Sequence, residues 1–408
     1  MRLAVSLLGT VLAVGGCAVS GSRLSPIAEG YVRLTLQLAQ HDPGLVEGWR
    51  GPEAWRPALR APVADLVKEI ARLHSAAELA LPDLSSEERS RGRYLEHQLR
   101  ALQFAAGRLL GHSSSIDDQA RREFAATFSR VDRNAVANDH ARLDALLPGD
   151  GSLAERLSAL RAATTVTAER RERVIEAAIA ACRAATARTV DLPQGERVLV
   201  AFRKGLAWDA YARYAGEQRT EIEINDDGPL DVSRAFRLAC HEAYPGHHVQ
   251  HVLIDRLQAE HGWPELQLTP GFGRHLLLAE GAAEVAADLA LTEADRMIFY
   301  RDTLLPLAGL SSERADTLVR VEDILIELLP VVTDVARRYL DGSIGQARAI
   351  EQLRNDALVA NPSATLAFIE RHRGRALVYG EGRRVVYAML PTRDLPGLCA
   401  ALGGGAVQ

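Results

Sequence analysis

The sequence predicts a mainly α-helical protein that carries a small antiparallel β-sheet. Over most of the chain before residue 190, apolar residues recur every three to four positions, which is the spacing of amphipathic helices. Alanine, leucine, arginine and glutamate are abundant and aromatic residues make up only 5% of the chain, a composition that favours helices. From Val198 onward the apolar residues instead alternate with polar ones for a short stretch, as they do in strands.

Each predicted element follows from this change of spacing. Strands are expected at Val198–Phe202, around Tyr211 and Tyr214, and at Ile222–Ile224, just before the longest motif of the chain. Helices are expected on both sides of this sheet, over residues 24–41, 62–79, 85–111, 116–146, 152–162 and 167–190, then over 312–341 and from Asn361 onward.

The N-terminus has the pattern of an export signal. Arg2 precedes an apolar run from Leu3 to Val14, which is too short to span a bilayer. The run ends in V-G-G-C, which resembles a bacterial lipoprotein processing site with Cys17 as the lipid-bearing first residue. We therefore predict an exported protein that is tethered to the cell envelope, and Ala18 after the cysteine favours the outer membrane. An ordinary secretory signal is the alternative.

The chain is expected to comprise three parts. These are a signal peptide (1–16), a helical N-terminal region (17–190) and a motif-bearing region (191–408), with the last two packed around a cleft. The net charge of −5 lacks the basic footprint of a nucleic-acid-binding protein. Three cysteines remain after Cys17, so they cannot all pair with one another. Cys240 is expected to be a small core residue on the helix face away from the motif.

A metal-binding pattern occupies residues 241–250, which read H-E-A-Y-P-G-H-H-V-Q. In the known pattern H-E-x-x-H, the two histidines lie one turn apart on one helix face. Here Pro245 stands at the fourth position after His241, and in an unbroken helix His247 would lie about 9 Å further along, too far to share one ion. Because Pro-Gly breaks helices, we expect a kink that returns His247 to the ion. His248 is the alternative second ligand, and His251 is a further candidate.

A second segment supplies carboxylates. Glu280, Glu284 and Asp288 lie four residues apart on one face of an otherwise apolar predicted helix. Such a stripe is unfavourable unless positive charge lies against it, and the alternative is a face that meets solvent. We predict that Glu280 is the third protein ligand of one zinc ion per chain and that Glu284 orients a ligand histidine. Glu242 is then the general base.

The two motifs together resemble a bacterial family with the signature H-E-x-x-P-G-H-x-x-Q followed by E-G-W-A, which is placed among the gluzincin metallopeptidases. The resemblance covers roughly residues 195–390. It implies a zincin-like architecture with a substrate cleft, the ligands His241, His247 and Glu280, and Glu242 as base, and it includes Gln250 as a motif position. It favours His247 over His248, because the family varies after its second histidine. The chain departs from the signature at Ala282, where the family has tryptophan.

Two further segments match the same family. Residues 221–225 resemble the edge strand along which such enzymes bind a peptide, and residues 375–382 resemble a C-terminal motif centred on a tyrosine, here Tyr379. Tyr379 is a candidate hydrogen-bond donor to the oxyanion of a tetrahedral intermediate, and a packed core tyrosine is the alternative.

The sequence thus predicts a lipid-anchored zinc hydrolase, most simply a peptidase that acts on peptide substrates. Two alternatives stay open. One is a non-catalytic envelope lipoprotein that keeps the fold as a binding or structural module, and the other is a zinc amidase that acts on non-peptide substrates. An intact Glu242 argues against the first, because a purely structural metal site needs no base.

Overall fold

The computed structural model describes residues 23–206 and 208–405 and confirms a mainly helical chain with little β-structure. Cys17 and the predicted signal segment lie outside these residues. Before the sheet, the helices are α1 (Ser25–Leu38), α2 (Val63–Ala80), α3 (Ser86–Leu109), α4 (Ile116–Arg122), α5 (Arg133–Leu146), α6 (Leu153–Ala163) and α7 (Ala168–Thr186). Hydroxyl side chains cap several of them, as Ser85, Ser115 and Ser152 do for α3, α4 and α6.

The prediction of one continuous helix over residues 116–146 is wrong, because the chain forms two helices with a non-helical segment between them. The chain leaves helical geometry after Arg122, with Ala125 at a φ of 49°, and the rings of Phe124 and Phe128 stack in the core at a centroid distance of 6.0 Å. Asp132 then caps α5 by accepting hydrogen bonds from two backbone N–H groups. Periodicity missed this break because the same apolar residues are buried in both conformations.

A three-stranded sheet follows, in the positions that the alternation predicts. Its strands are β2 (Arg197–Arg203), β3 (Ala210–Gly216) and β4 (Arg219–Asn225), in the spatial order β2-β4-β3. The expected antiparallel pairing holds for β3 and β4, but β2 runs parallel to β4, so this sheet is mixed. The segment expected to be an edge strand, residues 221–225, lies in β4 and is the middle strand. The edge beside the motif helices is β3 instead.

A second, two-stranded antiparallel sheet joins β1 (Val46–Trp49) to β5 (Leu268–Pro270), and the sequence did not predict it. Each strand is three or four residues long, too short for an alternating pattern to stand out.

Helices return after the sheet. They are α8 (Val232–Glu242), α9 (His247–His261), α10 (Gly273–Ala290), α11 (Glu293–Phe299), α12 (Leu305–Ala308), α13 (Ala315–Glu327), α14 (Leu329–Leu340), α15 (Gln346–Asn355), α16 (Pro362–His372), α17 (Val378–Met389) and α18 (Leu395–Gly405). The predicted helix over 312–341 divides at Leu328, just before Pro330 in the first turn of α14. The predicted helix start at Asn361 is confirmed, since the Asn361 side chain caps α16.

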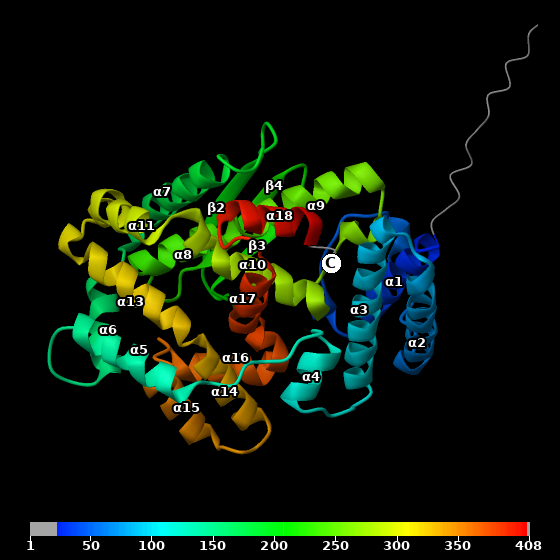
Figure 1. Ribbon diagram of the computed structural model, residues 1–408, viewed down its shortest axis with the longest axis horizontal. Coiled ribbons are helices and arrows are strands. Elements are labelled where there is room, and N and C mark those ends of the chain that lie inside the picture. The colour runs from blue at the N-terminus through cyan, green and yellow to red at the C-terminus, as the bar shows by residue number, and fades with distance from the viewer. Residues whose placement is uncertain (1–22, 207, 406–408) are drawn as a thin grey trace, which may run out of the picture.

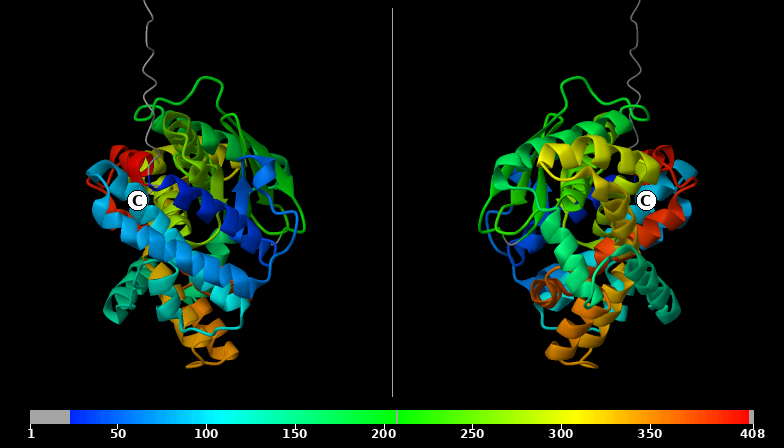
Figure 2. Two further views of the ribbon diagram at one scale, coloured as in Figure 1. Left: turned by 90° about the vertical axis from the view of Figure 1, so that its right-hand side faces the viewer. Right: turned by 90° about the vertical axis from the view of Figure 1, so that its left-hand side faces the viewer.

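Helices α10 and α17 lie at the centre of the molecule, between α1–α3 on one side and α11 and α13 on the other (Figure 1). The side views show the blue N-terminal helices covering one flank and the yellow helices the opposite flank (Figure 2). The largest apolar core draws residues from α5, α6 and α7 as well as from α8, α10 and α13, so it crosses the predicted boundary at residue 190. Within the described part of the chain, no helix has the length and apolarity needed to cross a bilayer.

A very close helix contact fixes α17 against α10. A Cβ atom on Gly281 would lie 2.2 Å from the backbone carbon of Gly382, and one on Gly382 would lie 2.3 Å from the carbonyl oxygen of Leu277. Neither position tolerates a side chain. This contact sets where Tyr379, at the start of α17, meets α10.

A disulfide between Cys182 and Cys240 ties α7 to α8, where the sequence left the thiol pairing open. Cys240 is fully buried in the main core, as expected, and Cys399 is free. The bond closes a loop with a sequence separation of 58, so it restricts the unfolded chain considerably.

We expect the double variant C182A/C240A to lose about 4 kcal/mol of unfolding free energy, the loop-entropy value for this separation. The measurement is urea unfolding without reductant. C399A removes a thiol but no cross-link and should change stability by about 1 kcal/mol or less. Alkylation of both Cys182 and Cys240 in the folded, unreduced protein would contradict the pairing.

Candidate metal centre

The chain breaks its helix at Pro245 and Gly246, as the sequence predicts. Helix α8 ends at Glu242 and α9 begins at His247, and the Gly246 N–H donates to the carbonyl oxygen of Cys240 over 3.0 Å. A Cβ atom on Gly246 would lie 1.8 Å from the carbonyl oxygen of His241, so only glycine fits this turn. The turn brings the two imidazole rings together, with His241 and His247 edge to face at a centroid distance of 4.9 Å.

Glu280 on α10 faces both imidazoles. Its Oε2 atom lies 3.4 Å from Nε2 of His241 and 3.6 Å from Nε2 of His247. One ligand atom from each of the three residues lies within 4.8 Å of the other two. Ligand atoms of a tetrahedral zinc ion with bonds of about 2.1 Å stand roughly 3.4 Å apart, so the observed spacing suits such an ion.

The donor set also fits a metal electrostatically. Oε2 of Glu280 is buried and finds no hydrogen-bond partner in the part of the chain that the structure describes. Burial by itself would raise the pKa of Glu280, but His247 and His241 outweigh it and hold that pKa far below its usual range. Burial would likewise lower the pKa of His241, but Glu280 and Glu284 raise it well above its usual value. A carboxylate oxygen that is buried without a hydrogen bond and two facing imidazoles form a donor set that suits a divalent cation.

Two side chains set the tautomers of the imidazoles. Glu284 Oε1 lies 3.4 Å from Nδ1 of His241, the orienting role that the sequence assigned to it. Gln250 Oε1 lies 3.2 Å from Nδ1 of His247. Since both partners are acceptors, each Nδ1 donates to its partner, and Nε2 is the ring atom of each histidine that would bind a metal ion.

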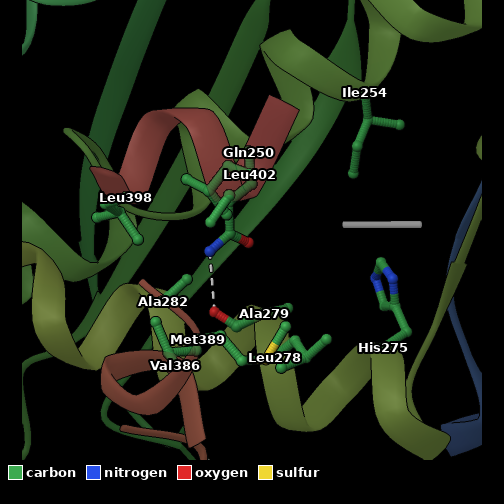
Figure 3. A pocket seen from close by; sticks show the side chains of 11 residues that line it. Gln250, Ile254, His275, Leu278, Ala279, Ala282, Val386, Met389, Leu398 and Leu402 are labelled. Carbon is green, nitrogen blue, oxygen red and sulfur yellow. Dashed lines mark hydrogen bonds between the residues drawn. The ribbon is translucent and has the colours of Figure 1, made fainter. Parts of the chain in front are cut away.

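Gln250 also joins the two ligand-bearing helices. Its Nε2 atom donates to the carbonyl oxygen of Ala279 over 2.8 Å, one residue before Glu280 (Figure 3). Behind this bridge lies an apolar cavity of about 480 Å³, open space at its mouth included, which Leu278, Val386 and Leu402 help to line. In the sequence Gln250 was only a motif position, whereas in the structure its side chain contacts His247 and links α9 to α10.

The two alternative histidines lie elsewhere. His248 is fully buried, with Nε2 2.8 Å from Oε2 of Glu196 and Nδ1 2.8 Å from the hydroxyl of Thr220 on β4. Tyr244 also donates to Glu196, so this network fastens the turn between α8 and α9 to the sheet. His251 stacks on Tyr214 at a centroid distance of 4.9 Å.

Glu242 and Tyr379 both lie at the site. The Glu242 side chain is buried, and burial together with the charges of Glu280 and Glu284 raises its pKa, although His241 and His247 partly oppose this. The Tyr379 ring stands 6.4 Å from the ring of His241. The charge of Glu280 and burial raise the pKa of Tyr379 well above its usual value, so its hydroxyl stays a donor.

Several other polar and aromatic side chains have partners within the protein. Asp288, the third acid of the stripe, pairs with Arg237 at 3.1 Å and with Arg383, so the stripe faces two cations there. Arg384 bonds Glu381. Trp49 and Trp55 stack on each other at 5.8 Å against the N-terminal core.

Sequence reasoning missed Glu47 on β1. The pKa of Glu47 is raised to about 7, by burial first and then by the charge of Glu280, while Arg375 and His247 oppose the shift. The Tyr211 hydroxyl on β3 donates to the Glu47 carbonyl oxygen over 3.4 Å. Glu47 lies almost 200 residues before the motif in a strand that was not predicted, and no local pattern marks it.

Comparisons with known proteins bear on the fold alone. No protein-family model and no curated protein matches the chain. A solved structure of a candidate lipoprotein from Colwellia psychrerythraea superposes with a TM-score of 0.53 at 17% identity, over 84% of this chain and 67% of the other. A second, a candidate lipoprotein of unknown function from Shewanella oneidensis, gives a TM-score of 0.41 at 13% identity, over 80% of this chain and 66% of the other. The chain thus shares a fold with the Colwellia protein and spans about two thirds of the length of each.

The geometry predicts different outcomes for the adjacent histidines. H247A should abolish stable zinc binding, whereas H248N should retain one zinc per chain but unfold at a lower temperature, because the His248 network is structural. Elemental analysis after dialysis and a thermal melt are the measurements. Zinc that stays in H247A and leaves in H248N would reverse the assignment.

Replacing Gln250 tests its positioning role. Q250L should keep the fold, since the neighbouring cavity is apolar, but weaken zinc binding about 10- to 100-fold by releasing the ring of His247. Competition with a chelator measures this affinity. Q258L, two turns further along α9, is the matched control and should bind zinc as the wild type does. Equal affinities for all three proteins would remove Gln250 from the site.

Proposed function

We propose that the protein is a zinc-dependent hydrolase, and specifically a peptidase. The observation that carries the proposal is the convergence of His241, His247 and Glu280 on one point, with the buried carboxyl of Glu242 beside them. Three protein donors leave a fourth position for water, which is the composition of a catalytic rather than a structural zinc site. A bound zinc ion would supply a Lewis acid and lower the pKa of a water molecule.

The chain's own residues then perform the proton transfers. Glu242 accepts a proton from the attacking water and passes it to the leaving nitrogen, from a buried position beside the ligand histidines. Tyr379 remains protonated and donates a hydrogen bond to the oxyanion of the tetrahedral intermediate.

The edge strand β3 supports a peptide as the substrate. It is the last strand in the order β2-β4-β3, and its Tyr211 reaches across to Glu47. An extended chain can add to such an edge by backbone hydrogen bonds, which bind any peptide regardless of sequence. A zinc amidase would use the same metal and base but would gain nothing from a strand edge.

A second candidate is a non-catalytic envelope lipoprotein. It is favoured by the solved structure from Colwellia psychrerythraea, which shares the fold and is described as a candidate lipoprotein. We propose lipid anchoring through Cys17 at the cell envelope, in the outer membrane, for both candidates, since an anchor and a hydrolase site do not exclude each other.

The substitution E242Q separates an enzyme from a binding module. It should keep zinc and the fold while lowering peptide hydrolysis by roughly 10²- to 10⁴-fold, as expected when a general base is removed. The assay is cleavage of a pool of short peptides, read by mass spectrometry, with zinc content measured in parallel. E176Q, an exposed position on α7, is the control and should cleave like the wild type. Zinc-loaded wild type that cleaves nothing would leave the lipoprotein candidate in place.

A further inference from the structure

The turn that carries the two ligand histidines is held at both ends by the same helix, α7. Cys240 directly precedes His241 in the chain, and His248 directly follows His247. Both flanking side chains, those of Cys240 and His248, are fully buried. Each is tied to one of two consecutive residues of α7, so this helix fixes where the turn begins and where it ends.

The first of these ties is covalent. The disulfide between Cys182 and Cys240 joins α7 to α8, with the two Cα atoms 5.8 Å apart. The carbonyl oxygen of Cys240 also accepts the Gly246 N–H over 3.0 Å, which is the hydrogen bond that closes the turn. A displacement of Cys240 would therefore move His241, its neighbour in the chain, and would loosen the turn just before His247.

The second tie is an ion pair. Arg183, the residue after Cys182, donates from Nε to Oε1 of Glu196 over 2.7 Å, and Oε2 of Glu196 lies 2.8 Å from Nε2 of His248. The Arg183 side chain is 49% exposed, and ion pairs of exposed side chains hold their partners weakly. The disulfide is thus the stronger of the two restraints, and it acts on the side of the turn where His241 lies.

We propose that the Cys182–Cys240 disulfide positions the metal ligands, and that the chain binds zinc tightly only once this bond has formed. The proposal rests on the zinc site of the proposed hydrolase, but not on its activity toward peptides. A bond that only restricted the unfolded chain would raise stability and leave the zinc affinity of the folded protein unchanged. A bond that positions ligands changes that affinity, by about 10- to 100-fold for contacts that orient metal ligands.

The disulfide forms as the chain folds. Two thiols become one disulfide, and their two electrons and two protons pass to a disulfide of another molecule, which is reduced to two thiols. Because Cys182 and Cys240 are both fully buried in the folded protein, this exchange takes place before the core closes. Thiols stay reduced in the cytoplasm and pair in oxidising compartments outside it. For the envelope location proposed above, the chain therefore acquires its zinc after export.

The wild-type chain in two redox states tests the proposal. One batch is unfolded in urea, reduced with a phosphine, refolded and desalted under argon, and the other is treated in the same way without the phosphine. Alkylation with mass spectrometry confirms the state of the pair, and circular dichroism confirms folding. We expect the reduced protein to bind zinc at least about 10-fold more weakly in competition with a chelator. Equal affinities would overturn the proposal, whereas an oxidised protein that binds no zinc would overturn the hydrolase as well.

The variant C182A separates positioning from stability, and it replaces the first test if the reduced wild type does not refold. It removes only the sulfur atom that Cys240 bonds, and it should lower zinc affinity at least about 10-fold at a temperature where the protein is folded. L95A, at a fully buried position of α3 in the N-terminal core, is the matched control for lost stability and should bind zinc as the wild type does. Wild-type affinity in C182A, or an equal loss in L95A, would show that the bond contributes stability alone.

Discussion

The burial of one carboxylate, Glu280, constrains the centre of this molecule. A charge taken from water must be met by an opposite charge or a metal, and here two imidazoles from separate helices face it. That requirement fixes how α8, α9 and α10 approach one another. The side chains behind the imidazoles, Glu284 and Gln250, satisfy the far nitrogens and leave the near ones free to bind.

The backbone is shaped to allow this approach. Gly246 passes so close to His241 that no side chain fits, and Gly281 and Gly382 let α10 and α17 touch through their backbones. Beneath the turn, His248 and Glu196 tie the motif to the sheet. The two adjacent histidines therefore have different roles. His247 faces Glu280, and His248 holds the turn between α8 and α9 in place through Glu196.

The site is assembled from separate helices of the chain. Helices α8, α9 and α10 bring His241, His247 and Glu280 together, and α17 brings Tyr379 beside them. The charge of Glu280 also raises the pKa of Tyr379, so its hydroxyl keeps its proton.

The sequence by itself determined the helical class, the strands β2 to β4, and the choice of His241, His247 and Glu280 as the residues that converge. Each of these depends on the spacing of residues within one segment or on the Pro-Gly pair that breaks a helix. Only the tertiary structure decided the rest. Whether His247 or His248 faces the site depends on the direction of a turn held by Glu196, 51 residues before His247 in the chain. The parallel pairing of β2, the break after Arg122, the Cys182–Cys240 bond and the position of Glu47 likewise depend on contacts between distant segments. The periodicity of apolar residues predicts which residues are buried, but it does not predict which residues they pack against.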